Sequence, residues 1–192
     1  MKIYDCFMYF DEEVVVDVRL HTLNEFVDYF VIVESRFTHK GESRELKFDH
    51  KKFEKFKDKI IYIIDEEAYP QTQEIQTENS EDEKSIKLIF NAAYRENGQR
   101  NLLLKGLKEA NDEDLILISD VDEIPKLNNL NFKNINEKII LFKQDMFYYK
   151  FNLWLPNLIW TGTKACRRKN LISPQWLRNI KDRKYSFFRI DT

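Results

Sequence analysis

Three acidic side chains stand close together in the middle of the chain, directly after an apolar run. Residues 115–119 carry four apolar side chains in five, and Asp120, Asp122 and Glu123 follow at once. Such a run indicates a buried strand of an α/β sheet, and sheets of this kind bind ligands just beyond the carboxyl ends of their strands. Three carboxylates on one short turn repel one another unless a cation or water lies between them. Because Mg²⁺ and Mn²⁺ favour carboxylate, water and phosphate oxygens, the turn predicts a divalent cation site that a nucleoside diphosphate would complete.

The same pattern has other interpretations. An Asp-x-Asp at a strand end is typical of enzymes that use nucleotide sugars, but a solvated acidic turn that caps the next element has the same residues. A metal-dependent phosphohydrolase is a third possibility, although its Asp-x-Asp usually follows the first strand and precedes Thr or Val. Here the motif comes late and precedes Glu123 and Ile124. The apolar run, Pro125 and the basic segment 95–108 that leads into the strand favour the first interpretation.

Strands and helices are predicted to alternate along the chain. Predicted strands cover residues 2–10, 26–34, 59–65 and 115–119, and residues 138–151 form a long strand or hairpin. Predicted helices begin near Val16, at residues 50–59 and at the capping box of Ser80 and Glu83, and residues 99–110 continue as helix after a possible break at Asn97-Gly98. Residues 68–79 have neither period and are predicted to be a loop. This order predicts an α/β fold with a mostly parallel central sheet.

Composition excludes several classes of protein. The 192 residues carry 31 basic and 33 acidic side chains that are interleaved, so neither a nucleic-acid-binding surface nor a polybasic membrane surface is indicated. Cys6 and Cys166 lie far apart and outside any CxxC or Cys/His cluster, which indicates buried thiols in a reducing compartment. The chain has no signal-peptide pattern and no apolar run of transmembrane length, so we expect a cytoplasmic protein with a small-molecule partner.

Four segments together resemble glycosyltransferase family 17, and the resemblance covers nearly the whole chain. The segments are DCFMYFDEEVVVDVRLHTLNEFVDYFVIVES, QRNLLLKGL, DLILISDVDEIP and IWTGTK. The positions that match the family pattern are Asp5, Glu34, Arg100, Asn101, Asp120, Asp122, Glu123, Trp160 and Gly162, with Arg178 as a looser match. The resemblance implies a single GT-A-like domain over residues 1–192, with a donor-binding core in about 1–150 and an acceptor side in 151–192. It also implies a UDP-sugar donor, which is UDP-GlcNAc in the best-known members, a glycan acceptor, and Mn²⁺ or Mg²⁺ bound through Asp120 and Asp122.

Within that resemblance several residues have alternative roles. Asp122 is predicted to bind the metal directly, and Asp120 to contact the ribose or a metal-bound water. Arg100 could hold the diphosphate with a bidentate guanidinium, or it could form an ion pair on a helix surface. Glu34 could accept hydrogen bonds from uridine or ribose, or from a loop amide.

Two further residues are assigned to the donor side, and the general base is a separate assignment. Asn101 is grouped with the donor-binding residues, and Trp160 is either a platform for a sugar ring or a core residue. The general base is not identified by the sequence, and Glu123 and Asp145 are the candidates. Asp5 and Arg19 are interpreted as structural.

The chain stops at Thr192, whereas members of the resembling family continue with a segment that contains a further histidine. No histidine follows His50 here. We therefore expect an incomplete acceptor side, with donor binding stronger than transfer. A catalytically inactive protein that only binds nucleotide sugars is the alternative to an active transferase.

Overall fold

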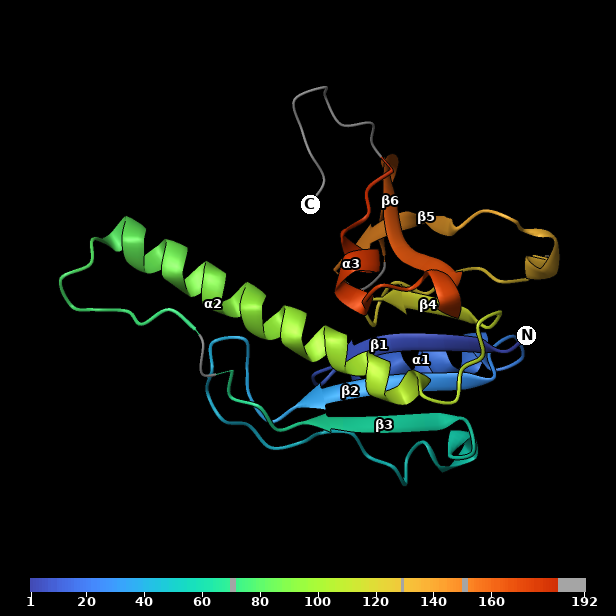
Figure 1. The fold of residues 1–192 in the computed structure, drawn as a ribbon, viewed down its shortest axis with the longest axis horizontal. Helices are drawn as coiled ribbons and strands as arrows, with labels where there is room; N and C mark the ends of the chain where they lie inside the picture. The colour runs from blue at the N-terminus through green and yellow to red at the C-terminus, as the bar shows by residue number, and fades with distance from the viewer. Residues whose placement is uncertain (70–71, 129, 150–151, 183–192) are drawn as a thin grey trace.

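A mixed sheet forms the centre of the molecule. The computed structural model describes residues 1–69, 72–128, 130–149 and 152–182. Within these ranges the strands are β1 (Ile3–Tyr9), β2 (Tyr29–Ser35), β3 (Ile60–Asp65), β4 (Leu115–Ser119), β5 (Ile139–Tyr148) and β6 (Leu153–Arg167). Their order in the sheet is β3-β2-β1-β4-β6-β5 (Figure 1). The first four strands are parallel, β6 is antiparallel to β4, and β5 is antiparallel to β6. The predicted α/β class with a mostly parallel sheet is confirmed.

Helices cover both faces of the parallel strands. Helix α1 (Glu13–Leu23) packs against one face, and α2 (Glu81–Asn101) and α3 (Pro174–Asn179) lie over the other (Figure 1). Short 3₁₀ helices are η1 (Glu54–Phe56), η2 (Leu102–Leu107), η3 (Phe132–Asn134) and η4 (Arg168–Asn170). The central strands are therefore buried on both sides, which explains their almost continuous apolar sequences. None of the helices in the described ranges is long and apolar enough to cross a membrane.

Two helix predictions were wrong in detail. Residues 50–59 form only the 3₁₀ turn η1, in which Phe53 and Phe56 are buried although no α-helix supports them. Helix α2 neither ends nor breaks at Asn97-Gly98, and it changes to the 3₁₀ helix η2 only at Leu102. Gly98 serves a packing role instead, because a Cβ at this position would overlap the ring of Tyr69.

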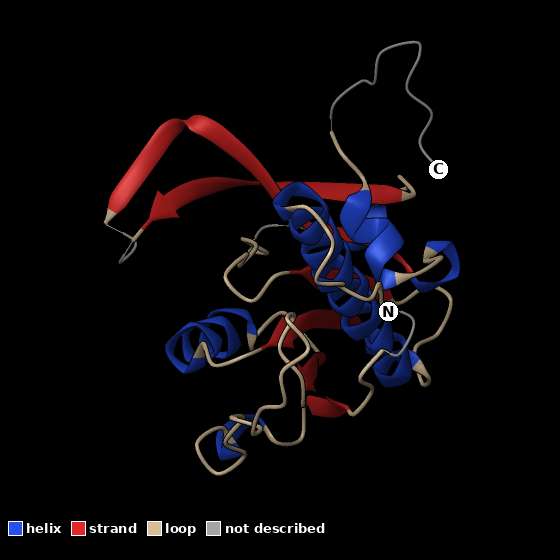
Figure 2. Ribbon diagram, turned by 90° about the vertical axis from the view of Figure 1, so that its left-hand side faces the viewer, coloured by secondary structure: helices blue, strands red, loops and turns tan. Residues whose placement is uncertain are grey.

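Strand β6 was not predicted as a separate element. The last strand or hairpin predicted from the sequence ends at residue 151, which lies outside the described residues, as does Lys150. Pro156 and Gly162 interrupt the β-prone pattern beyond that point, yet both lie within the long strand β6. Register shifts between β5 and β6 bend the pair, and its far half reaches out beyond the rest of the molecule (Figure 2).

The strand order determines where a ligand can bind. From β1 the chain passes through α1 to β2 and β3 on one side, and β4 then lies on the other side of β1. The carboxyl ends of β1 and β4 thus meet where the direction of the strand order reverses, which is the usual ligand position in open α/β sheets. Residues 120–125 begin at this point.

Candidate functional site

The acidic turn, residues 120–125, follows β4 directly, and its successive side chains alternate between buried and more exposed positions. Val121 and Glu123 are buried, Asp122 is exposed, and Asp120 is partly buried. The Glu123 N–H donates to the Asp120 carbonyl (3.1 Å), and Glu123 Oε2 accepts from the Asp120 N–H (2.9 Å). These reciprocal bonds fix the backbone of the turn and the carboxylate of Glu123, while Asp122 between them is exposed.

Arg19 of α1 joins this turn to β1 through hydrogen bonds. Its Nε and Nη2 donate to both carboxylate oxygens of Asp5 in β1 (2.7 and 2.6 Å), and both side chains are fully buried. Its Nη1 donates to three backbone carbonyls of the turn at 3.0 to 3.1 Å, those of Asp120, Val121 and Glu123. The structural interpretation of Asp5 and Arg19 is thereby confirmed, and their specific task is to shape the acidic turn.

Two guanidinium groups hold the carboxylate of Asp120. Oδ1 accepts from Arg100 Nη2 at the end of α2 (2.9 Å), and Oδ2 accepts from Arg178 Nη2 in α3 (2.6 Å). Burial of Asp120 opposes its ionisation, but the charges of Arg178 and Arg100 outweigh burial and lower the pKa of Asp120 below its ordinary value. Asp120 is therefore a carboxylate at neutral pH.

Glu123 connects the acidic turn to β6 and α3 through hydrogen bonds. Its Oε1 accepts from Trp160 Nε1 in β6 (2.6 Å) and from Arg178 Nη2 (2.9 Å), in addition to the Asp120 N–H on Oε2. A Cβ on Gly162 would lie 2.7 Å from Glu123 Cδ, so only glycine permits this close approach of β6. Oε1 thus accepts two hydrogen bonds and Oε2 one, which favours a positioning role for this carboxylate.

Asp122 extends into solvent, where its carboxylate can approach a cation. Among the residues that the structure describes, no three His, Cys, Asp or Glu side chains are grouped so that they could hold a metal by themselves. A magnesium-type site needs only one or two carboxylates when phosphate and water supply the other oxygens. Each Asp120 oxygen accepts one described guanidinium bond and keeps a lone pair. The chemistry of this donor set fits a divalent cation that is shared with a diphosphate.

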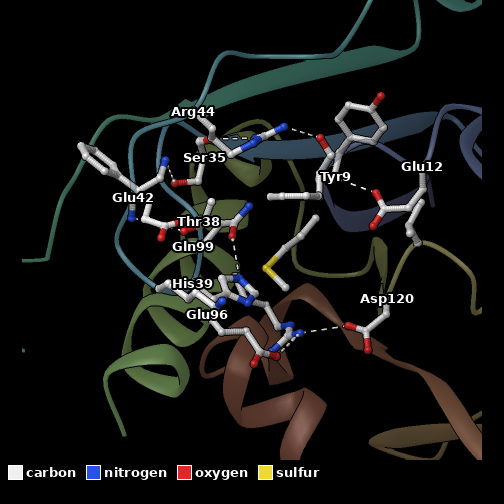
Figure 3. A pocket seen from close by; sticks show the side chains of 16 residues that line it. Tyr9, Glu12, Ser35, Thr38, His39, Glu42, Arg44, Glu96, Gln99 and Asp120 are labelled. Atoms are coloured by element: carbon white, nitrogen blue, oxygen red, sulfur yellow. Dashed lines mark hydrogen bonds and ion pairs between the residues drawn. The ribbon is translucent and has the colours of Figure 1, made fainter. Parts of the chain in front are cut away.

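A pocket of about 640 Å³ opens at the carboxyl ends of β1, β2 and β4 (Figure 3). Asp120 and Val121 form one part of its wall, and Glu96, Gln99 and Arg100 of α2 form another. The remaining wall comes from the end of β1 and from the loop after β2; its residues are Met8, Tyr9, Phe10, Glu12, Ser35, Phe37, Thr38, His39, Lys40, Glu42 and Arg44. The pocket thus lies at the switch point of the sheet and includes two of the predicted site residues, Arg100 and Asp120.

The loop after β2 is fixed to the body by polar contacts. Arg44 Nη1 donates to the Ser35 carbonyl (2.7 Å), and Arg44 Nη2 forms an ion pair with Glu34 (2.9 Å). His39 lies 3.4 Å from Gln99 Oε1, and its carbonyl accepts from Arg95 Nη1 (3.2 Å). These contacts give the outer wall of the pocket a defined shape before any ligand binds.

The other predicted site residues lie around this centre. Glu34 is fully buried beneath the loop, where it accepts from the backbone N–H groups of Lys47 (2.6 Å) and Phe48 (3.1 Å) and from the hydroxyl of Tyr62 (2.7 Å). This is the contact with loop amides that the sequence left as an alternative. Asn101 Oδ1 accepts from the Gln175 N–H (3.0 Å) and so positions α3.

Among the described residues, no hydrogen bond or ion pair joins Asp145 to the acidic turn. It is exposed in β5, beside Gln144, whose cross-strand partner is Trp160. Because neighbouring strand residues point to opposite faces, Asp145 faces away from the side on which Trp160 meets Glu123. Trp160 is partly exposed and bonded to Glu123, so it is neither a core residue nor fully available to a ligand.

Several pocket residues were not singled out from the sequence. Arg44, His39 and Gln99 come from a polar loop and from a helix whose inner face is not apolar. Their place in the chain could have indicated Arg44 and His39, because a loop that follows β2 must lie at the same edge of a parallel sheet as the acidic turn. Arg178, a loose match in the sequence, contacts both Asp120 and Glu123.

Lys164 provides a pH-dependent test of the packing behind the site. Burial, helped by the charge of Arg178, lowers the pKa of Lys164 to about 8, and its Nζ donates to the Arg178 carbonyl (2.7 Å). Between pH 8 and 10 the unfolded chain keeps this proton while the folded chain loses it, so the free energy of unfolding should rise with pH, by roughly 2 kcal/mol from this group. Urea unfolding of wild type and Lys164→Met at pH 8, 9 and 10 would measure this. A rise of equal size in the variant would contradict the assignment.

Comparisons with known proteins identify the family of this chain. Beta-1,4-mannosyl-glycoprotein 4-beta-N-acetylglucosaminyltransferase from Homo sapiens and that from Rattus norvegicus are each 30% identical to this chain, and the enzyme from Mus musculus is 29% identical. Each alignment covers 61% of this chain and 20% of the relative, so the match spans about a fifth of the length of these curated proteins. No solved structure matches the chain significantly. The sequence profile of glycosyltransferase family 17 matches residues 1–172, and the chain therefore belongs to glycosyltransferase family 17.

Proposed function

We propose that this chain is a metal-dependent glycosyltransferase with a GT-A-like arrangement, which binds UDP-GlcNAc in the pocket and transfers N-acetylglucosamine to a glycan hydroxyl. The observation that carries the proposal is the pocket at the switch point, with Asp120 and the buried Arg100 on its wall. Its volume is in the range of small-molecule sites. Family membership supports the reaction class, and the named relatives support the choice of sugar.

The pocket offers different chemistry at its two sides. Tyr9 and Arg44 lie on the opposite side of it from Glu96 and Asp120 (Figure 3). Arg44 also covers the ring of Phe10, with its guanidinium carbon 4.3 Å from the ring centre. The partly aromatic side suits a nucleobase, and the side with Glu96, Arg100 and Asp120 suits ribose and a metal-bound diphosphate. A UDP-sugar in this orientation directs its sugar toward the acidic turn.

Arg100 is proposed to contact the diphosphate. Its Nη groups are held by Glu96, Asp120 and Gln175, but its buried Nε has no hydrogen-bond partner within the described ranges. A buried donor without a partner is costly, and an anionic ligand in the pocket would satisfy it. Arg100 therefore forms ion pairs with Glu96 and Asp120, as the alternative interpretation of the sequence expected, and its Nε is still free to donate to a ligand.

Arg100→Lys is expected to weaken UDP binding by about 1–2 kcal/mol, because an ammonium group cannot reproduce the bonds of the planar guanidinium. Uridine, which lacks phosphates, should bind equally to both proteins. Calorimetric titration with UDP and with uridine measures the difference. Equal weakening of both ligands would assign Arg100 to the fold alone.

Asp122, with Asp120 beside it, is proposed to hold Mn²⁺ or Mg²⁺. When bound, the cation neutralises the charge that develops on the departing diphosphate. The protein itself orients the donor through the pocket walls and holds the acceptor in line, and such positioning can contribute roughly 7–11 kcal/mol to lowering a barrier. A general base must then take the acceptor proton.

Glu123 and Asp145 remain the candidates for that base. The three donors on Glu123 favour a role in positioning β6 and α3, whereas the exposed Asp145 has a carboxylate that solvent can reach. If Asp145 is the base, Asp145→Asn should lower kcat and leave KM for the donor unchanged. Unchanged kcat would remove Asp145 from the mechanism.

The experiment that tests the proposal follows UDP release from UDP-GlcNAc with Mn²⁺, with and without a mannose-containing N-glycan acceptor. We expect acceptor-stimulated release that stops with a chelator. Binding of UDP-GlcNAc without release under any condition would support the inactive binding protein instead. Release of inorganic phosphate without a transferred sugar would support the phosphohydrolase.

A further inference from the structure

Arg178 of α3 bridges two carboxylates of the acidic turn with a single nitrogen atom. Its Nη2 lies 2.6 Å from Asp120 Oδ2 and 2.9 Å from Glu123 Oε1, and its Nη1 donates to the Gly162 carbonyl (3.2 Å). The Arg178 side chain is only 14% exposed, so salt and water screen these contacts less than those of a surface ion pair. One positive group is thus surrounded by three oxygen atoms, two of them from carboxylates.

Oxygen atoms grouped in this way are also ligands for a hard divalent cation. Carboxylate and backbone carbonyl oxygens suit Ca²⁺, Mg²⁺ and Mn²⁺. The two carboxylate oxygens lie nearly as close to Arg178 Nη2 as they would to Ca²⁺, whose oxygen ligands are at about 2.3–2.6 Å. The guanidinium group therefore holds Asp120 and Glu123 together much as a bound cation would.

The elements around Arg178 fix it in this place. Helix α3 lies beside β4 and β6 (Figure 1). The side chain of Ser173 caps the helix, and the Gln175 N–H donates to Asn101 Oδ1 at the end of α2 (3.0 Å). Lys164 Nζ donates to the Arg178 carbonyl (2.7 Å). The position of the guanidinium is therefore set by contacts of its helix with α2 and β6, and not only by its own ion pairs.

The charges of the acidic turn are largely balanced within the protein. Arg100 Nη2 donates to Asp120 Oδ1 (2.9 Å), so both oxygens of this carboxylate accept from guanidinium groups. Arg19 adds no net charge, because it is paired with Asp5. Asp122 is exposed, and within the described ranges its carboxylate has no hydrogen bond or ion pair. A cation that approaches the turn alone therefore meets one free carboxylate and the repulsion of two guanidinium groups.

The two arginines differ in how a diphosphate could reach them. Arg100 lines the pocket, and its buried Nε has no partner in the described part of the chain. Arg178 is not among the residues that line the pocket, and both of its Nη atoms are bonded to the turn or to Gly162. A ligand in the pocket can thus engage Arg100, whereas Arg178 acts on the turn.

We propose that Arg178 is an internal counter-ion of the acidic turn, which takes the position of a cation between Asp120 and Glu123 and makes binding of a divalent cation depend on a diphosphate. The diphosphate supplies negative charge and further oxygen ligands, which offset the two guanidinium groups. This role rests on the proposed function for the place of the diphosphate, but the affinity of the turn for a cation alone is measurable without any nucleotide. Arg178 is thus a positioning residue.

Calorimetric titration of Mn²⁺ alone into the full chain tests the role of Arg178. Arg178→Gln removes the charge and keeps a donor for the carboxylates. It should bind Mn²⁺ at least about tenfold more tightly than the wild type, because the repulsion of one guanidinium at contact distance exceeds one tenfold step in affinity. Mn²⁺ should also raise the melting temperature of Arg178→Gln more than that of the wild type. A residue that only supports the fold would lose stability without this gain in affinity.

Two further variants serve as controls. Arg178→Lys keeps the positive charge and should bind Mn²⁺ as weakly as the wild type. Arg36→Gln removes an exposed guanidinium that is paired with Glu66 and not bonded to the turn, so it should also leave Mn²⁺ affinity unchanged. Unchanged Mn²⁺ affinity in folded Arg178→Gln, or an equal gain in either control, would overturn the proposal. Circular dichroism verifies that each variant is folded.

The wild type gives a second measure if Arg178→Gln does not fold. Its affinity for Mn²⁺ alone should be at least about tenfold lower than its affinity for Mn²⁺ at saturating UDP, and equal affinities would overturn the proposal. A different result would reject the donor site instead. If UDP does not bind the wild type in Mn²⁺ but Arg178→Gln still gains affinity for Mn²⁺ alone, the proposed function fails and the counter-ion role of Arg178 is supported.

Discussion

Arg19→Met is expected to lower the free energy of unfolding by about 3–5 kcal/mol, the largest stability effect of any single change considered. The substitution removes the partner of the fully buried Asp5 carboxylate and the donor to three turn carbonyls. The isolated buried charge carries a desolvation cost, and so does the Val121 carbonyl, whereas the carbonyls of Asp120 and Glu123 keep the Glu123 N–H and the Thr163 hydroxyl as donors. Urea unfolding followed by circular dichroism measures the change.

Two further variants separate the effect of the lone Asp5 charge from the effect of the lost hydrogen bonds to the turn. Arg36→Met breaks an exposed ion pair with Glu66 and should change stability by less than about 1 kcal/mol. The double variant Asp5→Asn with Arg19→Met removes the lone charge and should recover part of the stability, but not UDP binding, because the turn carbonyls still lack their donor. Stability of Arg19→Met within about 0.5 kcal/mol of the wild type would show that Arg19 does not hold the turn.

Asp122→Asn is expected to reduce Mn²⁺-dependent UDP binding by at least about 100-fold, since the loss of a metal ligand should exceed the 10–100-fold typical for residues that only support a ligand. The fold should be unaffected because Asp122 is exposed. Asp58→Asn, a change at another exposed aspartate, is the matched control and should bind UDP normally. Calorimetry with and without Mn²⁺ measures both. If UDP binds Asp122→Asn as tightly as the wild type in Mn²⁺, Asp122 is not a ligand.

The sequence allowed the parallel half of the sheet to be predicted well. Strands β1, β3 and β4 lie within one residue of their predicted bounds, because buried parallel strands are continuous apolar runs between polar residues. Strand β2 begins later than predicted, at Tyr29, since Phe26 and Val27 pack as part of the connection from α1. The capping box of Ser80 and Glu83 starts α2 as predicted.

The contacts that shape the site could not be predicted in the same way. Arg19 meets the acidic turn about one hundred residues further along the chain, and no local pattern reports such a contact. The outer wall of the pocket depends on how the loop after β2 folds back on α2 through His39 and Gln99. Strand β6 was not predicted because its pairing with β4 on one side and β5 on the other depends on the sheet and not on its own residues.

Titration of UDP into the wild-type chain, with Mn²⁺ and then with a chelator, tests most directly whether the pocket at the switch point is a metal-dependent donor site. We expect a single site that binds UDP in Mn²⁺ and binds it far more weakly once the cation is removed. Absence of UDP binding in both conditions, or binding of equal affinity in both, would contradict it.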